Sequence, residues 1–196
     1  MNTASTEAIP GEYYLRGIPE MASGFKLNAD NSFEFFLVYG ALDRLGSGKW
    51  SVEKNQVVFN SKSWSGKDFA LIQSKKTADE GITIRITDNN ESLLRYMHAS
   101  TGSRREDVWE DSDEHGIIKL PASSSTSMIS LVFEFCPERI SIFTIEGTEH
   151  NYFEFRIEPW LTEFFFKDFR LMITNEGFHG PHPMILEKEF DYVKKK

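Results

Sequence analysis

Cysteine is almost absent from this sequence, which has a single one, Cys136, among 196 residues. One cysteine cannot form an internal disulfide, so the small disulfide-stapled domain classes are excluded. Cys136 ends an apolar stretch and has no basic residue beside it. We therefore expect a buried, inert thiol rather than an activated thiolate.

Positive charge is also in short supply. Lys and Arg number 22 against 30 Asp and Glu, which gives a formal net charge of −8. Nucleic acids and anionic membranes both need a basic face, and the only run of basic residues is Lys194-Lys195-Lys196 at the C-terminal end. We read that run as a solvated tail, and we expect neither nucleic acid nor membrane as a partner.

Long apolar runs and catalytic motifs are missing as well. No stretch approaches the roughly 18–20 apolar residues of a membrane span, and the N-terminal residues lack the pattern of a secretory signal. We therefore expect a soluble, cytoplasmic protein. The sequence contains no G-x-S-x-G elbow and no glycine-rich loop before a helix. We therefore expect a protein without cofactor, and we favour a non-enzyme over an enzyme.

What the sequence does contain is aromatic residues in a period-2 pattern. Aromatics make up 14% of the chain, with 17 Phe, which indicates a packed core. Residues 32–39 alternate, with Phe33, Phe35 and Leu37 on one face and Glu34 on the other. Similar short runs separated by turns recur along the chain, and no long amphipathic helix interrupts them. The pattern predicts an all-β protein.

The aromatic content of the strands changes twice along the chain. Residues 11–80 and 147–196 are rich in aromatics, whereas residues 81–146 hold about six short, less aromatic strands. We expect the outer two segments to form one antiparallel β-barrel of about eight or nine strands, and residues 81–146 to form a β-sandwich inserted into it. The rival arrangement is two separate domains followed by a β-rich tail.

Two motifs in the central segment carry a resemblance. The strand and turn Ile84-Arg85-Ile86-Thr87-Asp88-Asn89 precede the turn and strand Asp111-Ser112-Asp113-Glu114-His115-Gly116-Ile117-Ile118-Lys119-Leu120-Pro121. This order resembles carboxypeptidase-regulatory or transthyretin-like domains, and the sandwich is also of immunoglobulin-like size. Such modules are usually non-catalytic, so the resemblance implies folding or binding rather than chemistry.

The outer segments are similar to lipocalin-like barrels (calycins) through Gly48-x-Trp50, although that family carries this signature on its first strand. The barrel aromatics have two interpretations. They fill the interior, which is our preference, or they line an apolar pocket with arginines as polar anchors. The candidate ligand-binding residues for the second interpretation are Tyr39, Arg44, Trp50, Phe155, Arg156 and Trp160.

Only one weak metal motif is present. His179 and His182 lie three residues apart, but Gly180-Pro181 between them forces a turn and no third histidine or cysteine is close in sequence. We expect no metal site, and a metal-dependent hydrolase is a distant alternative. The leading expectation is a binding or interaction module with an unknown protein or small-molecule ligand. The alternative is a barrel that binds a small apolar or carbohydrate-like ligand.

Overall fold

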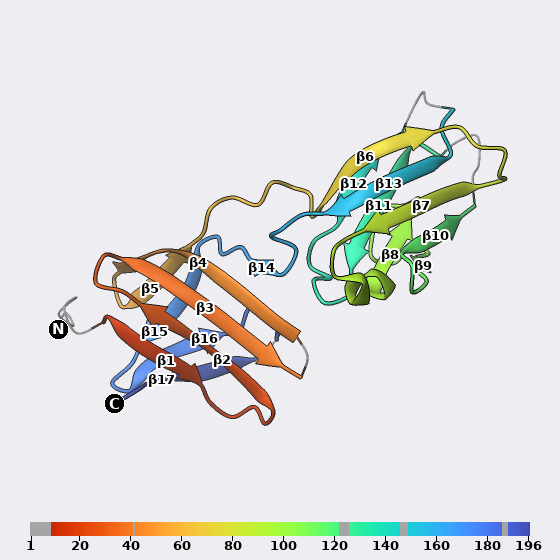
Figure 1. Ribbon diagram of the computed structural model, residues 1–196. Coiled ribbons are helices and arrows are strands. Elements are labelled where there is room, and N and C mark those ends of the chain that lie inside the picture. Colours follow the sequence, from red (N-terminus) through yellow and green to blue (C-terminus); the bar gives the residue numbers. More distant parts are fainter. Residues whose placement is uncertain (1–8, 41, 122–125, 146–148, 186–187) are drawn as a thin grey trace. The chain divides into compact units, whose positions relative to one another are not determined.

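The computed structural model describes residues 9–40, 42–121, 126–145, 149–185 and 188–196, and they form an all-β chain (Figure 1). It divides into two compact units, one made of Met1–Trp64 with Thr162–Lys196 and the other of Ser65–Leu161. The described helical structure is one short 3₁₀ turn, η2 (Glu91–Tyr96). None of the described helices is long and apolar enough to cross a membrane.

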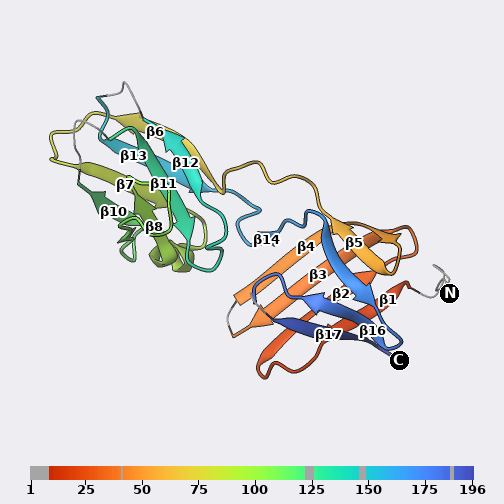
Figure 2. The same ribbon diagram turned by 180° about the vertical axis from the view of Figure 1, so that it is seen from behind.

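The first unit is a closed antiparallel barrel of eight strands. Its strands are β1 (Gly11–Leu15), β2 (Met21–Leu27), β3 (Ser32–Tyr39), β4 (Leu42–Glu53), β5 (Gln56–Asn60), β15 (Phe169–Ile173), β16 (Gly177–Pro181) and β17 (Glu189–Lys194). The order is β4-β3-β2-β1-β17-β16-β15-β5, and pairing of β4 with β5 closes the ring. The two-residue strand β14 (Glu163–Phe164) adds to β4 in parallel. Figure 1 shows β2, β3 and β4 in front, and Figure 2 shows β15, β16 and β17 in front.

Aromatic rings pack the barrel interior. The alternation predicted for residues 32–39 holds, because Phe33, Phe35 and Leu37 are buried while Glu34 is exposed. Phe25, 1% exposed, contacts six other rings at centroid distances of 4.5 to 6.3 Å. These six are Phe33, Phe35, Phe59, Phe166, Phe169 and Tyr192. An eight-stranded barrel is just wide enough for side chains to fill, and here the rings fill it.

One glycine in the barrel wall is required by a close approach between strands. A Cβ on Gly48 would lie 2.1 Å from the carbonyl oxygen of Asn60 and 2.8 Å from the ring of Phe33. Real Cβ atoms do not come this close to backbone, so only glycine allows β4 to pass β5 here. The Gly-x-Trp motif thus combines a close approach of two paired strands with a buried ring, since Trp50 is 5% exposed.

The second unit is a sandwich of two four-stranded sheets. One sheet has the order β10-β7-β13-β6, with β6 (Phe69–Lys75), β7 (Ile82–Thr87), β10 (Ile117–Leu120) and β13 (Tyr152–Ile157). The other has the order β12-β11-β8-β9, with β8 (Met97–Ser100), β9 (Glu110–Asp111), β11 (Met128–Phe133) and β12 (Ser141–Thr144). Buried side chains from both sheets form one continuous core, including Ile84, Leu131 and Phe155. Cys136 is buried in this core, and its Sγ donates to the carbonyl of Leu161 at 3.1 Å.

The insert is longer than the predicted residues 81–146. β6 and β13 lie within the predicted barrel segments 11–80 and 147–196, yet both belong to the sandwich. β13 pairs in parallel with β7 and antiparallel with β6, and its buried Phe153, Phe155 and Ile157 pack into the sandwich core. The insert is therefore 65–161 rather than 81–146. β16, which the sequence pattern did not predict as a strand, completes the eight strands of the barrel.

Candidate functional site

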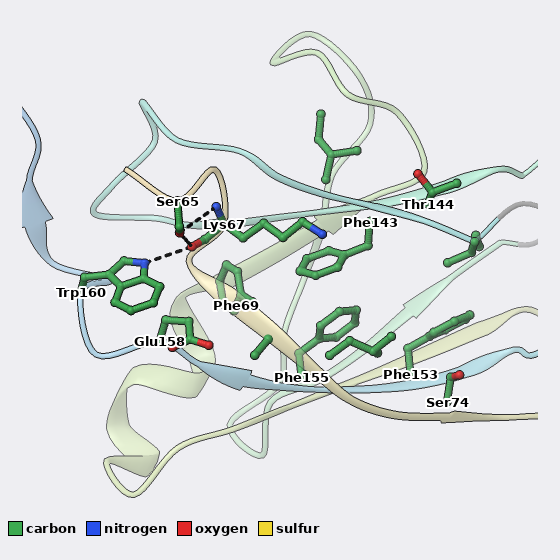
Figure 3. Close-up of a pocket in the computed structure, with 14 residues that line it drawn as sticks. Ser65, Lys67, Phe69, Ser74, Phe143, Thr144, Phe153, Phe155, Glu158 and Trp160 are labelled. Carbon is green, nitrogen blue, oxygen red and sulfur yellow. Dashed lines mark hydrogen bonds between the residues drawn. The ribbon is translucent and has the colours of Figure 1, made fainter. Parts of the chain in front are cut away.

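A pocket of about 750 Å³ lies in the sandwich unit (Figure 3). Its walls come from the start of the unit, from β6, from β12 and from the end of β13. The lining residues are Ser65, Lys67, Phe69, Ala70, Leu71, Ser74, Ile142, Phe143, Thr144, Ile145, Phe153, Phe155, Glu158 and Trp160. The volume falls in the range of about 300–1,000 Å³ that is usual for ligand pockets.

The sheet topology explains why the pocket opens at this place. β6 and β12 are the edge strands of their two sheets, and each pairs on one side only among the described strands. At the opposite side of the sandwich, β10 lies against both β8 and β9. The sandwich is therefore covered along one side and open along the other.

Core aromatic rings form the floor of the pocket. Phe143 of β12 and Phe155 of β13 come from opposite sheets, and their ring centroids lie 4.6 Å apart. Phe69 and Phe153 line the same pocket and are each 2% exposed. A ligand that enters between the two edges would therefore contact the hydrophobic core of the unit directly.

Lys67 gives the pocket a positive charge. Its Nζ lies 4.3 Å from the centroid of the Phe143 ring, a cation–π contact. In the part of the chain that the structure describes, this ammonium makes no ion pair or hydrogen bond. The main chain of Lys67 is held firmly, because its carbonyl accepts hydrogen bonds from Ser65 Oγ (2.9 Å) and Trp160 Nε1 (3.0 Å). Figure 3 shows the lysine side chain extending from this anchored backbone toward Phe143.

A buried ion pair fixes the same end of the pocket. Arg139 Nε donates to Asp68 Oδ2 at 2.7 Å, and the two side chains are 6% and 2% exposed. The Arg139 guanidinium also donates to the carbonyl of Leu161. The main-chain N–H of Asp68 donates to Ser141 Oγ at 2.7 Å, which joins the start of β6 to the start of β12. The two edges that flank the pocket are thus tied together at one end.

The other end of the pocket carries a hydroxyl beside an imidazole. Ser74 Oγ lies 2.8 Å from His150 Nδ1, within the reach needed between a nucleophile and its base. Both side chains are exposed to water, so charge developing there would be solvated rather than held by preorganised donors. The arrangement offers hydrogen bonds to a ligand more readily than chemistry.

Two of the six candidate ligand-binding residues line this pocket, Phe155 and Trp160. Arg156 neighbours them in sequence but does not line the pocket, because it lies on the exposed face of β13 between the buried Phe155 and Ile157. Two further pocket residues, Lys67 and Phe143, are not indicated by the sequence pattern. Lys67 lies in a polar stretch that resembles an ordinary turn, and Phe143 lies in a short strand with no feature that distinguishes it from the other strands.

The remaining three candidates belong to the barrel and do not form one site. Tyr39 is 50% exposed at the end of β3. Arg44 is fully buried, with its guanidinium carbon 3.7 Å from the Phe164 ring centroid. Trp50 is buried and donates from Nε1 to the carbonyl of Asn28 at 3.0 Å. Arg44 and Trp50 are therefore part of the barrel packing.

His179 and His182 lie on opposite faces of the barrel wall. His179 is partly exposed, and hydrogen bonds to Asp191 (2.8 Å) and Glu189 (3.0 Å) raise its pKa. His182 is 2% exposed, and burial lowers its pKa to about 4. The two imidazoles face different partners and cannot share a metal ion. Across the residues described, no group of three or more His, Cys, Asp or Glu is arranged to hold one.

Comparisons of the chain with protein-family models, with curated proteins and with solved structures found no match.

Proposed function

We propose that this chain is a non-catalytic binding module that binds its partner through the pocket between β6 and β12. The observation that carries the proposal is the open side of the sandwich, where the core rings Phe143 and Phe155 line a pocket of about 750 Å³ beside Lys67. Apolar walls with a few fixed polar groups are the usual composition of a binding pocket.

The barrel is proposed to have a scaffold role. Its closed eight-stranded form supports a likeness to lipocalin-like barrels, and the two-sheet insert supports a likeness to transthyretin-like sandwiches. Both likenesses are proposals of architecture. The tightly packed rings around Phe25 count against a ligand inside the barrel, because a ligand would have to displace side chains that already contact one another.

An NMR titration tests the proposal. We expect 2-naphthoate, an aromatic carboxylate, to shift the amide signals of residues 65–74 and 141–145 and the indole signal of Trp160, while barrel signals stay unchanged. Leu71 lines the pocket and pairs with Phe155, so its side chain lies on the pocket face of β6. The L71W variant should therefore fill the pocket and remove these shifts. V108W places the same residue type at a side chain that is 79% exposed, and it should leave the titration unchanged. Shifts confined to the barrel, or shifts unaffected by L71W, would contradict the proposal.

The Ser74–His150 pair allows a separate test of the proposal that the pocket is non-catalytic. We expect hydrolysis of 4-nitrophenyl acetate by the wild-type chain to equal that of the S74A variant. A tenfold or larger drop in S74A would make Ser74 a nucleophile and the pocket an active site.

A further inference from the structure

β6 has an outer edge that is available for pairing. It is seven residues long and pairs with β13 alone among the described strands, with a register shift between Glu154 and Phe155 that leaves Ile72 without a partner residue. The outward N–H and C=O groups of an edge strand must bond to water or to another strand. β12, the facing edge, is only four residues long, so β6 is the better template.

An apolar side chain of β6 faces the pocket but is uncovered. Leu71 lies on the same face of β6 as the buried Phe69 and pairs with the buried Phe155, yet it is 46% exposed. It also lines the pocket. A further strand beside β6 would cover this side chain.

The geometry of a β-sheet allows a further strand beside β6. A strand paired with β6 would lie about 4.8 Å beyond it and would point every second side chain into the space between the sheets. That space is the pocket floored by Phe143 and Phe155. Peptides that add to a sheet edge derive affinity from main-chain hydrogen bonds and specificity from pockets for alternate side chains.

Charge indicates what else the added segment should carry. Lys67 lies at one end of β6 without an anionic partner in the described chain, and Lys75 at the other end contacts the ring of Tyr152 at 4.7 Å. The acidic residue of the pocket, Glu158, pairs with Arg156. An acidic side chain on the added segment would complement Lys67.

We infer that the pocket binds an extended segment of a partner protein, which adds to β6 as a further strand. Alternate apolar side chains of the segment enter the pocket, and an acidic side chain meets Lys67. This inference rests on the proposed function, because it names the occupant of the same pocket.

The probe is a phage-displayed library of nine-residue peptides. Thr occupies the odd positions, and Val, Ile, Phe, Asp or Lys occupies the even positions, which preserves the strand period of two. Selection uses the full chain, with counter-selection against the L71W variant. We expect enrichment of peptides with apolar even positions and at least one Asp, and we expect the synthetic peptides to lose at least fivefold in affinity on K67E. Exchanging Asp for Lys in the peptide should restore binding to K67E.

Backbone methylation separates strand pairing from simple insertion of a side chain. Only alternate N–H groups of an added strand face its neighbour. Methylating either the odd or the even amides of an enriched peptide should therefore abolish binding in one of the two versions, with at least tenfold loss, and leave the other version bound. Equal affinities of the two versions would overturn the inference, as would absence of enrichment over L71W.

Two further outcomes are informative. If 2-naphthoate binds the pocket but no peptide is enriched, the strand inference fails while the proposed function stands. If neither binds, both fail. If the chain dimerises in light scattering and L71K abolishes the dimer, while V108K does not, the occupant is a second copy of the chain and the partner-segment inference is overturned.

Discussion

His182 should make the barrel sensitive to acid. Its Nδ1 accepts a hydrogen bond from the main-chain N–H of Met184 at 3.2 Å, so the ring must be neutral with its proton on Nε2. Nε2–H then donates to Ser23 Oγ at 3.1 Å, and Ser23 donates onward to the carbonyl of Phe36 at 3.0 Å. Protonation of Nδ1 would break the first of these bonds and place a charge among rings. Burial lowers the pKa of His182 to about 4 for this reason.

The sign and size of the effect follow from linkage. Between the folded-state pKa of about 4 and the unfolded value of 6.5, the unfolded chain binds the proton more readily. The free energy of unfolding therefore falls as the pH drops from about 7 toward 4. At about 1.4 kcal/mol per pKa unit, His182 alone costs the barrel about 2.5 kcal/mol near pH 4.5 relative to pH 7.5.

Two measurements check this prediction. NMR titration of the histidine ring signals should show His182 neutral down to about pH 4, while His179 titrates above the ordinary histidine value. Urea unfolding, followed by barrel amide signals, should lose about 2.5 kcal/mol less between pH 7.5 and 4.5 in H182Q than in wild type. The reasoning is refuted if His182 titrates near 6.5, or if H182Q and wild type depend on pH equally.

Three further predictions concern stability. D68A removes the buried carboxylate that lies 2.7 Å from Arg139 and leaves that cation with the more exposed Glu138 at 3.8 Å, so thermal denaturation should show the sandwich unit destabilised by about 3–5 kcal/mol, with the barrel unaffected. F25A removes the ring at the centre of the barrel cluster and should cost about 3–5 kcal/mol in urea unfolding, whereas L45A, at a side chain 63% exposed, should stay within about 0.5 kcal/mol. G48A forces a Cβ against the Asn60 carbonyl and should lower the melting temperature of the barrel by several degrees, and an unchanged value would contradict the close approach.

The alternation of apolar residues predicted which segments are strands better than it predicted which strands pair with one another. Residues 32–39 could be placed because Phe33, Phe35 and Leu37 alternate with polar or exposed neighbours. β16 could not be predicted, since Gly177, Gly180 and Pro181 give it none of the β-branched pattern of a strand. It is a strand because β15 and β17 pair with it on both sides.

Sheet membership was the harder problem. β13 is as rich in aromatic residues as the barrel strands, and nothing in its own residues shows that β7 will be its parallel neighbour. The candidate site depended on the same non-local information. Phe155 and Trp160 were found because aromatics stand out in any sequence. Lys67 matters only because β12, far along the chain, brings Phe143 beneath its ammonium.

The insertion of the sandwich has a consequence for how the barrel folds. β5 and β15 are neighbours in the barrel although the whole second unit lies between them in the chain. Trp160 donates to the carbonyl of Lys67, so the folded sandwich already holds its two ends together. It replaces an open loop of roughly 100 residues with one of about 10, which lowers the entropy cost of closing the barrel by about 2 kcal/mol. During synthesis the barrel cannot close until its last three strands, β15 to β17, have been made. A sandwich that folds first keeps the start of these strands close to β5, the strand with which β15 pairs.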